Sequence, residues 1–425
     1  MPVRVPRLLP LLVALGAFSC TAPVAPPGEG EGEPAEGEGE PGEGEGEGEG
    51  EGEGEGEGEP STGAAFFDIE RLHMVEITVA PEYLDTLEND PSVRVPATLR
   101  YDDVTVEQVG IKKKGQSTMR PLAEKPSFTL KIDELIQGQD IDGVERFALH
   151  NTVMDPSFLS ESLTYRFYRT AGLPAPRSAH AVVRFNGEVK GIYVVVEAVN
   201  REFLRGAFGD GSGNLYEGPW DFSADPTTAE LKDEDEGRSR DDLVALTNAV
   251  RSANDAELDD ALAPLLDVEQ ALRFIAVEMA FCLWDGYAVA AWNYYLYHVP
   301  VGAPSSSAGR FVFLPHGADW PYWHADLDPL DVDYRPWGPE YPPGDLAVAM
   351  TTGSFAARYL EALRSVRDDA FQTDALLAHI EGVSVTLHTA DVTDATLAAE
   401  LEAFDGAVQG ARDFVVDRRA FLDGY

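Results

Sequence analysis

Apolar and polar positions alternate along most of residues 64–133, and a period of two predicts strands. The strands are expected in residues 73–79, 93–101, 105–112 and 127–133. The polar face of the last strand carries Lys131, and Lys125 precedes the strand on the same face. Residues 81–89 interrupt the alternation and are expected to form a short helix or turn.

Helical spacing begins after residue 154. Asp155 is expected as the N-cap and Pro156 as the first helical residue, because both types are frequent at helix starts. The apolar stripe of this helix consists of Leu159, Leu163 and Phe167. Glu161 lies off the stripe, so it is expected either to face water, the default for a surface glutamate, or to reach a lysine across a cleft.

A hairpin and a mostly helical second half follow. Asn186-Gly187 between two apolar runs is a strong hairpin signal, and the paired strands are expected in residues 179–185 and 191–198. Helices are expected in residues 241–252, 257–266, 268–284, 354–370, 374–380 and 393–423, with strands at 214–216, 293–299 and 310–314. This order predicts an α+β fold with a strand-rich N-lobe, a helical C-lobe and a cleft between them.

The first residues have the pattern of a secretory signal. Arg4 and Arg7 make a basic start, and the apolar run Leu8 to Phe18 is too short to span a bilayer. Cys20 follows in a context that resembles a bacterial lipobox, with Ala17 where a large aliphatic residue is usual. We therefore expect residues 1–19 to be removed and Cys20 to be lipidated; an ordinary cleaved signal is the alternative.

Residues 28–59 are almost entirely glutamate and glycine, which predicts a disordered, extended tether. This tract holds 15 of the 75 acidic residues, so 60 acidic and 30 basic residues remain from Ala64 onward, a net charge of −30. Such a charge argues against nucleic acid as a partner. The domains expected are the signal at 1–19, the anchor and tether at 20–63, and a folded part at 64–425 with lobes meeting near residue 220.

Two acids and an amide stand in apolar, aromatic surroundings in the second half. Asp285 precedes Asn293 by eight residues, and Asp319 follows the strand expected at 310–314. Phosphoryl transfer needs such a set: one carboxylate to accept the hydroxyl proton, and an amide and a second carboxylate to hold Mg²⁺. The alternative is that each aspartate is only a cap or turn residue.

A basic, glycine-containing segment precedes the strand of Lys131. Lys114, Gly115, Gln116 and Ser117 combine a positive charge with a hydroxyl and a flexible backbone. Backbone amides and hydroxyls in such a turn can cup a phosphate. A solvated hairpin tip explains the same residues equally well.

These motifs, in this order, resemble the CotH family, which comprises spore-coat-type secreted kinases with an atypical protein-kinase fold. The resemblance spans residues 66–422. It rests on Lys114–Ser117, Lys125–Lys131, Asp155–Leu159, Phe185–Glu188, Gly191–Tyr193 with Glu197, Asn214–Tyr216, Trp284–Tyr287, Asn293–Tyr297 and Asp319-Trp320. Lys114 stands where the family usually has arginine, which keeps the charge and loses the bidentate fork.

The resemblance implies phosphorylation of Ser or Thr in exported or cell-surface proteins, with ATP and Mg²⁺ as cofactors. Asp285 would then be the catalytic base, and Asn293 and Asp319 would bind Mg²⁺. Lys131 would contact the ATP phosphates, with Lys125 as the second candidate. The resemblance further implies that Glu161 orients that lysine and that Glu197 lies near the adenine, where the two lobes join. The expected location is the cell surface, through Cys20, with secretion as the alternative.

A different class of function remains open, namely a non-catalytic surface binding or adhesive protein. Such a protein could bind a sugar or another protein through a set of aromatic side chains in an irregular stretch. The same side chains could instead pack against the helical lobe. The set consists of Trp320, Tyr322, Trp323, Tyr334, Trp337 and Tyr341. A calcium site at Asp326, Asp328, Asp331 and Asp333 is a weaker alternative, since the glycine and terminal glutamate of a helix–loop–helix site are missing. The sequence supports neither a zinc site nor a serine hydrolase.

Overall fold

The computed structural model describes residues 62–218, 220–232, 238–318, 325–335, 338 and 341–425. The chain divides into Met1–Glu57 and Gly58–Tyr425. All described residues belong to the second unit, so the expected signal, the lipidation site Cys20 and the tether lie outside the described residues and stay predictions. No helix in the described ranges is long and apolar enough to cross a bilayer.

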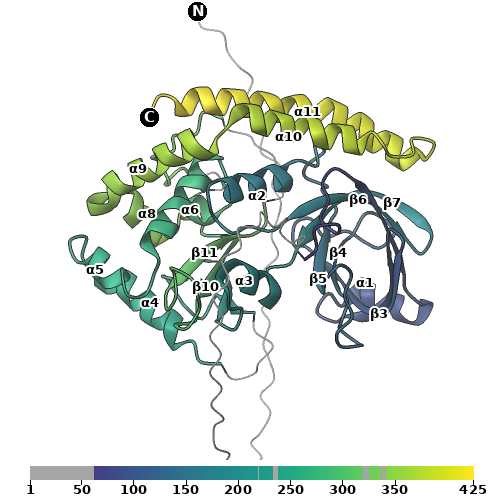
Figure 1. Ribbon diagram of the computed structural model, residues 1–425, viewed down its shortest axis with the longest axis horizontal. Coiled ribbons are helices and arrows are strands. Elements are labelled where there is room, and N and C mark those ends of the chain that lie inside the picture. Colours follow the sequence, from purple (N-terminus) through teal and green to yellow (C-terminus); the bar gives the residue numbers. More distant parts are fainter. Residues whose placement is uncertain (1–61, 219, 233–237, 319–324, 336–337, 339–340) are drawn as a thin grey trace, which may run out of the picture. The chain divides into compact units, whose positions relative to one another are not determined.

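Seven strands of the first half close into a barrel in the order β1-β2-β3-β4-β5-β7-β6 (Figure 1). The strands are β1 (Leu72–Thr78), β2 (Val95–Tyr101), β3 (Val104–Lys114), β4 (Ser127–Lys131), β5 (Arg146–His150), β6 (Ser178–Phe185) and β7 (Glu188–Glu197). Neighbours pair antiparallel except β1 and β6, whose parallel pairing closes the barrel. The short helices η1 (Pro81–Tyr83) and α1 (Leu84–Asn89) connect β1 to β2.

Strands β6 and β7 are buried on both faces. Tyr193 and Val195 point into the barrel core, whereas Ile192 and Val194 belong to the core of the helical lobe. Strands covered on both sides read as continuous apolar runs, as Ile192 to Val196 does. The β6–β7 hairpin is therefore the wall that the two cores share.

The helical lobe contains a four-stranded sheet in the order β11-β10-β8-β9. Its strands are β8 (Leu215–Gly218), β9 (Glu230–Leu231), β10 (Tyr294–His298) and β11 (Phe311–Pro315). The helices are α2 (Ser160–Thr170), α3 (Arg201–Phe208), α4 (Asp241–Ser252), α5 (Leu258–Leu262), α6 (Val268–Ala280), α7 (Tyr287–Ala290), α8 (Asp345–Thr351), η2 (Gly353–Phe355), α9 (Ala356–Ser365), η3 (Val366–Ala370), α10 (Thr373–Leu387) and α11 (Ala395–Leu422). The mixed α+β class expected from the sequence is present, and the closure of the barrel was not foreseen.

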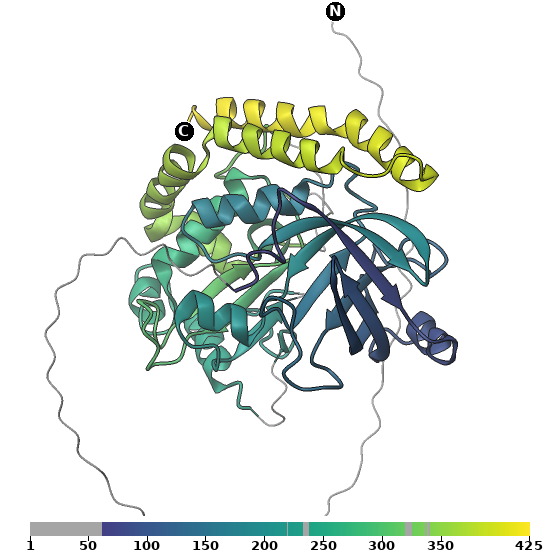
Figure 2. The same ribbon diagram turned by 45° about the vertical axis from the view of Figure 1, so that its right-hand side comes forward.

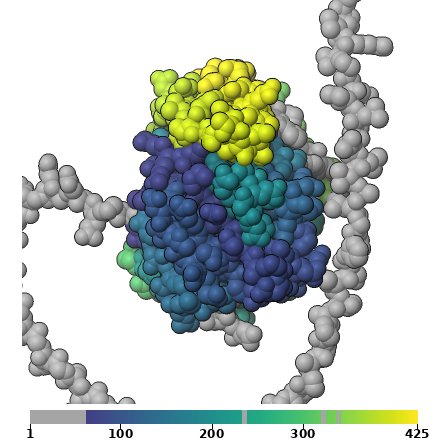
Figure 3. All heavy atoms as spheres, turned by 90° about the vertical axis from the view of Figure 1, so that its right-hand side faces the viewer, coloured from purple at the N-terminus to yellow at the C-terminus, as the bar shows by residue number. Residues whose placement is uncertain are grey.

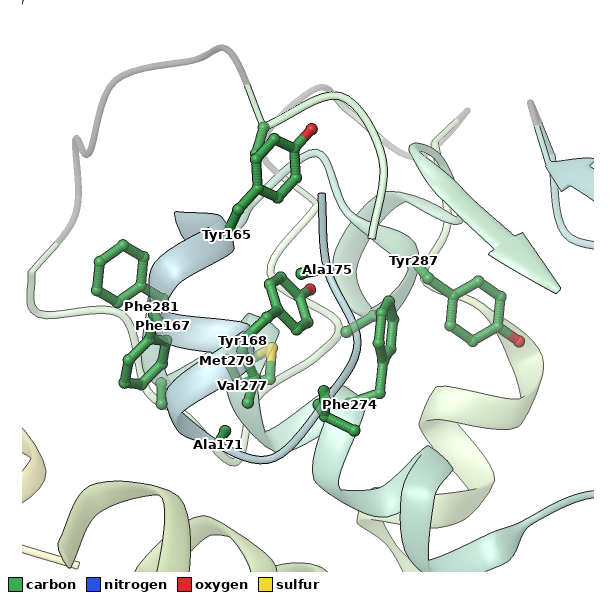
Figure 4. Close-up of a cluster of buried hydrophobic side chains, with 14 of the residues drawn as sticks. Tyr165, Phe167, Tyr168, Ala171, Ala175, Phe274, Val277, Met279, Phe281 and Tyr287 are labelled. Carbon is green, nitrogen blue, oxygen red and sulfur yellow. The ribbon is translucent and has the colours of Figure 1, made fainter. Parts of the chain in front are cut away.

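Helix α2 packs against α6 through aromatic side chains (Figure 4). The rings of Phe167 and Phe281 are stacked with centroids 4.6 Å apart, and the centroids of Tyr168 and Phe274 are 5.4 Å apart. Aromatic pairs in these geometries contribute about 0.5–1.5 kcal/mol beyond their buried area. The packing fixes α2, which carries Glu161, relative to the segment that leads to Asp285.

The start of α2 differs from the prediction. The helix begins at Ser160, and Asp155 and Pro156 lie in the preceding loop. The buried carboxylate of Asp155 accepts hydrogen bonds from the backbone N–H groups of Ser157, at 2.9 Å, and Ser160, at 2.8 Å. Asp155 therefore caps backbone N–H groups both in the loop before α2 and at the first residue of the helix, although it lies five residues before that first residue.

Helices α10 and α11 lie across the barrel and α2 (Figures 1 and 2). The space-filling view shows residues of these helices directly on the barrel strands (Figure 3). Glu400 of α11 accepts the backbone N–H of Ile192 at 2.5 Å. Gly191 lies beside it with φ of +119°, a backbone conformation that residues with a side chain rarely adopt.

Candidate active site

A hollow of about 420 Å³ lies between the barrel and the helical lobe and is lined by six of the predicted site residues. The barrel side contributes Lys114, Gly115, Gln116, Ser117, Thr118 and His150. The helical lobe contributes Glu217, Gly218, Trp220, Asp285, Trp292, Asn293, His316 and Gly317. Asp319 lies outside the described residues, so its expected role stays a prediction.

Asp285 and Asn293 are joined by direct hydrogen bonds. Asn293 Nδ2 donates to the Asp285 carboxylate at 3.0 Å and to the Asp285 carbonyl at 3.1 Å. Asn293 is held in the left-handed region with φ of 53°. Non-glycine residues in this region are uncommon and cluster at functional sites. Gly317 packs against Asn293, since a Cβ there would lie 2.7 Å from Asn293 Oδ1.

The loop of Asp285 is held from behind by Glu278 of α6, which is 1% exposed. Its carboxylate oxygens accept the backbone N–H groups of Tyr287, at 3.0 Å, and Ala288, at 2.6 Å. Burial raises the pKa of Glu278 to about 8, and the two backbone donors oppose that rise. Glu278 thus anchors the two residues that follow the Asp285-Gly286 turn.

Lys114, at the end of β3, contacts His150, at the end of β5, through Nζ and Nε2. The other ring nitrogen of His150 lies 2.7 Å from a carboxylate oxygen of Glu161 on α2. Three elements therefore meet in a row of a cation, an imidazole and a carboxylate. A lysine from a barrel strand connected to a glutamate from the neighbouring helix is the arrangement that positions phosphates in kinases.

Glu161 is 2% exposed, so the expectation that it faces water is wrong, and the alternative of a lysine across the cleft has support. Burial raises the pKa of Glu161 to about 7, and the charges of Lys114 and His316 act in the opposite direction. The position of Glu161 on the helix wrongly predicted exposure, because it takes no account of partners from other elements. His150, eleven residues earlier in the sequence, supplies the polar contact that compensates for burial of the carboxylate.

Lys131 lies elsewhere in the cleft. It lines a neighbouring hollow with Asp133 and Arg146, and its Nζ lies 3.3 Å from Glu134. The structure does not bring Lys131 into the hollow of Asp285, because β3 pairs Lys114 with Ser127 and Gly110 with Lys131. That register places Lys131 four strand positions away from Lys114.

Lys125 lies outside these hollows and forms a structural ion pair. Its Nζ is 2.5 Å from Glu400 Oε1 and 5.2 Å from the ring centroids of both Phe158 and Tyr193. Burial lowers the pKa of Lys125, and the charge of Glu400 opposes that effect. The second candidate for phosphate contact is therefore engaged between the barrel and α11.

Glu197 closes β7 where the chain leaves the barrel for α3, as expected for the junction of the lobes. Its carboxylate pairs with Arg177, with 3.0 Å between Arg177 Nε and Oε2. The residue also lines a third hollow, of about 280 Å³, between the barrel and the helical lobe. Its expected position near an adenine stays a prediction.

Aromatic side chains flank the hollow of Asp285. The ring centroids of Trp220 and Trp292 are 5.5 Å apart, and Trp292 and Tyr341 are 5.3 Å apart. Trp220 is 46% exposed. Of the aromatic set expected in this region, Trp320, Tyr322, Trp323 and Trp337 lie outside the described residues. Tyr341 joins the flanking rings, whereas the sequence did not single out Trp220.

The other metal hypotheses gain nothing from the geometry. Within the described ranges, no group of three or more His, Cys, Asp or Glu side chains is arranged to hold a metal ion. Asp328 and Asp331 accept backbone N–H groups two residues further along, at 2.9 Å and 3.1 Å. Such local bonds are typical of turns.

Three buried or cleft-lining residues were missed by sequence reasoning, namely His150, Glu278 and His316. His150 ends a strand on the same face as Ala148 and Arg146, so strand alternation could have placed it toward the cleft. For Glu278, the signal was a lone acid within the apolar residues of α6. His316 directly follows β11 and lies 3.5 Å from Glu217.

The fold is kinase-like: a barrel lobe and a helical lobe meet at a cleft. The cleft holds the Asp285–Asn293 pair and the row of Lys114, His150 and Glu161. The chain belongs to the CotH family: the family model described as CotH kinase protein matches residues 111–422. The inner spore coat protein H of Bacillus subtilis (strain 168) is 24% identical over 273 residues, which cover 59% of this chain and 68% of that protein.

Two solved structures are also similar to this chain. The Helicobacter pylori proinflammatory kinase CtkA has 9% sequence identity and a TM-score of 0.28, with 68% of this chain and 94% of that chain covered. The Shewanella oneidensis MR-1 toxin–antitoxin complex of HipA and HipB with operator DNA has 13% identity and a TM-score of 0.30, with 80% and 74% covered.

Proposed function

We propose that this chain is a protein kinase that transfers the terminal phosphate of ATP to a Ser or Thr hydroxyl of an exported or cell-surface protein. The observation that carries the proposal is one hollow that holds Asp285, Asn293 and Lys114 on facing walls. Asp285 is the base that accepts the hydroxyl proton, and its hydrogen bond from Asn293 orients it.

The residues present fit ATP and Mg²⁺. Asn293 offers its amide oxygen toward Gly317, where no Cβ obstructs it, and Asp319 follows two residues later. Carboxylate and amide oxygens are suitable ligands for Mg²⁺. The bound Mg-nucleotide supplies the phosphoryl group and its charge neutralisation. This chain's residues bind and orient it, with Asn293 and Asp319 as the metal ligands.

Lys114 is the residue we assign to the nucleotide phosphates, in place of Lys131 and Lys125. It lines the hollow of Asp285 and connects through His150 to Glu161, whereas Lys125 pairs with Glu400. Gly115, Gln116 and Ser117 follow Lys114 along the same wall and are assigned to phosphate contacts. Glu197, at the junction of the lobes, is assigned to the neighbourhood of the adenine.

The test is transfer from ATP labelled in its terminal phosphate, in the presence of Mg²⁺, by the full chain. Asp285→Asn is expected to reduce transfer by roughly 10²- to 10⁴-fold, the usual contribution of a positioned base. Asp319→Ala is expected to abolish it, and Asp413→Asn, an exposed acid on α11, to leave it unchanged. If the Asp285→Asn variant transferred phosphate as fast as the parent chain, Asp285 would not be the base.

The second candidate function is a surface binding or adhesive protein on a kinase-like scaffold. The exposed Trp220 beside Trp292 favours it, because exposed aromatic rings at a hollow are typical of ligand contacts. Thermal stability with and without Mg-ATP separates the two functions. A ligand at 100 times its Kd adds about 2.7 kcal/mol to stability, and no shift with any nucleotide would favour the binding protein. Attachment through lipidated Cys20 belongs to either function, with secretion as the alternative.

A further inference from the structure

Helix α7, which lies between Asp285 and Asn293 in the chain, has only four residues, Tyr287–Ala290. A helix of this length is not stable by itself, because one turn fixes several residues for very few hydrogen bonds. Its first N–H groups have no partner within the helix, and Gly286, the residue before it, has no side chain that could cap them. The position of the turn that carries Asp285 therefore depends on contacts from other elements.

Glu278 supplies the missing cap from the neighbouring helix α6. Each oxygen of its carboxylate accepts one N–H group, Oε1 that of Tyr287 at 3.0 Å and Oε2 that of Ala288 at 2.6 Å. A Cβ added to Gly286 would overlap with Oε1, so the carboxylate lies directly against the turn. Asp285 directly precedes Gly286, so Glu278 fixes the backbone from which the side chain of Asp285 projects.

A carboxylate at this place is costly for the fold. Glu278 is 1% exposed, and its neighbours Val277 and Met279 belong to the apolar cluster of Figure 4. The groups that favour its charge are the two backbone N–H groups and the hydroxyl of Tyr168, none of which is a cation. Burial of an ionised group without a cation lowers stability. Buried groups of this kind are typical of functional sites.

Titratable or charged groups approach the carboxylate from four elements. They are Tyr168 of α2, Asp285 of the turn, Tyr359 of α9 and Arg418 of α11, which donates to the carbonyls of the two residues after Glu278 at 2.6 Å and 2.9 Å. Burial raises the pKa of Glu278 to about 8; the two backbone N–H groups oppose the rise, and the charge of Asp285 adds to it. A protonated carboxyl presents a donor where the ionised form has an acceptor, so protonation opposes one of the two backbone hydrogen bonds.

We infer that Glu278 is a positioning residue of the proposed kinase, whose ionised carboxylate holds the turn of Asp285 in the geometry that lets Asp285 accept the proton of the acceptor hydroxyl. The inference rests on the proposed function and adds to it a residue that does not line the hollow of Asp285. Glu278 acts through the backbone of the turn, and the rate of transfer depends on its ionisation.

The test is the kinetics of transfer from labelled ATP by the full chain and by Glu278→Gln, which keeps the size of the side chain and cannot ionise. We expect kcat to fall by roughly 10- to 100-fold, since displacement of a reacting group by about 1 Å has effects of this size. KM for ATP should stay within about threefold of the parent value, because the interaction affects the transition state and not nucleotide binding. Glu269→Gln, the same substitution at an exposed position of α6 where the glutamate pairs with Arg358, is the matched control and should behave like the parent chain.

The pH profile separates positioning from a purely structural role. In the parent chain, kcat should rise as pH passes through about 8, because the ionised carboxylate is the form that accepts both N–H groups. Glu278→Gln should lack this rise. Glu278→Asp, which keeps a titrating carboxylate on a shorter side chain, should show the rise at a lower kcat, and it serves as the test if Glu278→Gln does not fold. Parental kcat and a parental pH profile in the folded variants would overturn the inference.

Hydrogen exchange tests the same contact without activity. Peptides that cover residues 285–293 should exchange at least about tenfold faster in Glu278→Gln than in the parent chain, while peptides of the barrel keep their rates, because the hydrogen bonds to Tyr287 and Ala288 are weakened. Equal exchange of this segment in the two chains would overturn the inference. Absence of transfer by the parent chain, with faster exchange in the variant, would count against the kinase and leave the anchoring of the turn by Glu278 standing.

Discussion

Lys125 forms an ion pair with Glu400, with 2.5 Å between Nζ and Oε1, although the two residues are 275 positions apart in the chain. The same glutamate accepts the backbone N–H of Ile192 on β7. One carboxylate of the last helix therefore holds both a loop and a strand of the barrel. Lys125, although it belongs to a family motif, therefore stabilises the fold, whereas Lys114 lines the candidate active site.

Removal of one partner from this pair should be costly. Their side chains are only 17% and 19% exposed. Glu400→Gln leaves a largely buried ammonium without its counter-charge, and breaking such pairs typically costs about 3–5 kcal/mol. We expect Lys125→Met with Glu400→Gln to be less destabilising than the sum of the single changes. Urea unfolding of the parent chain, the two single variants and the double variant measures the coupling energy between the two residues. If the losses of the single variants add to the loss of the double variant within about 0.5 kcal/mol, the pair adds no stability.

Two lysines of the cleft are expected to differ in their effect on transfer. Lys114→Met should reduce transfer from ATP by roughly 100-fold, because Lys114 lines the hollow of Asp285 and charged contacts to transferred phosphates are worth several kcal/mol. Lys131→Met should change it by less than about threefold, since Lys131 pairs with Glu134. Steady-state kinetics with varied ATP separates them, and a larger loss from Lys131→Met would reverse the assignment.

His150 is expected to act by positioning Lys114. His150→Gln should raise KM for ATP and lower kcat together, for a loss of roughly 10- to 100-fold in kcat/KM, since misplacement by about 1 Å has effects of this size. His298→Gln is the control, because this histidine lies 2.9 Å from Asp242 of the helical lobe and lines neither the hollow of Asp285 nor the one near Glu197. If the His150 variant kept a normal KM for ATP and lost only thermal stability, the histidine would have a structural role alone.

Acid should destabilise the chain partly through His379 of α10. Burial lowers the pKa of this histidine to about 3, and the charges of Arg166, His180 and Arg169 act in the same direction. The unfolded chain binds the proton near pH 6.5. The contribution of His379 is therefore present above pH 6.5 and is lost as pH falls toward 3, by about 1.4 kcal/mol per unit.

His379→Gln removes that titration. The stability difference between the parent chain and this variant should shrink as pH falls from about 7 to 4, measured by urea unfolding at each pH. Val385→Ala, at an exposed and non-titrating position of the same helix, is the control and should keep a constant difference. A difference for His379→Gln that did not change with pH would show that this histidine is not buried in its neutral form.

The thiol of Cys282 should be inert in the folded chain. The residue is 2% exposed, and burial raises the pKa of its thiol to about 12, with Arg418 opposing the rise. Because the thiolate is the reactive form, alkylation at pH 8 should be slower than for a free thiol by more than about 10³-fold. The measurement needs a Cys20→Ser background and a denatured control. Rapid labelling of the native chain would reveal opening of the helical core.

The local elements were predictable because they depend on neighbouring residues. Alternation located β1 and β4, and Asn186-Gly187 located the β6–β7 turn, where both residues have positive φ. Closure of the barrel depends on the parallel pairing of Leu72 with His180, which nothing local indicates. The sequence therefore predicted two lobes and missed the shape of the first.

The chemistry of the helical lobe was easier to predict than that of the barrel. Asp285 and Asn293 lie on either side of the four-residue helix α7, so the short stretch between them brings them together. The choice of lysine required the pairing register of β3 with β4, which places Lys114 at the hollow and Lys131 away from it. Burial of Glu161 required knowledge of His150, which reaches it from another element.

Arg418 of α11 extends this dependence to the last residues of the chain. Its fully buried guanidinium donates to the carbonyls of Met279 and Ala280, at 2.6 Å and 2.9 Å, and of Ala325 and Leu327, at 2.9 Å and 2.6 Å. The first pair ends the helix before Asp285, and the second follows the stretch of Asp319. A premature stop before Arg418 would remove only the end of α11 and yet delete, in one step, the hydrogen bonds that hold the segments beside both acids.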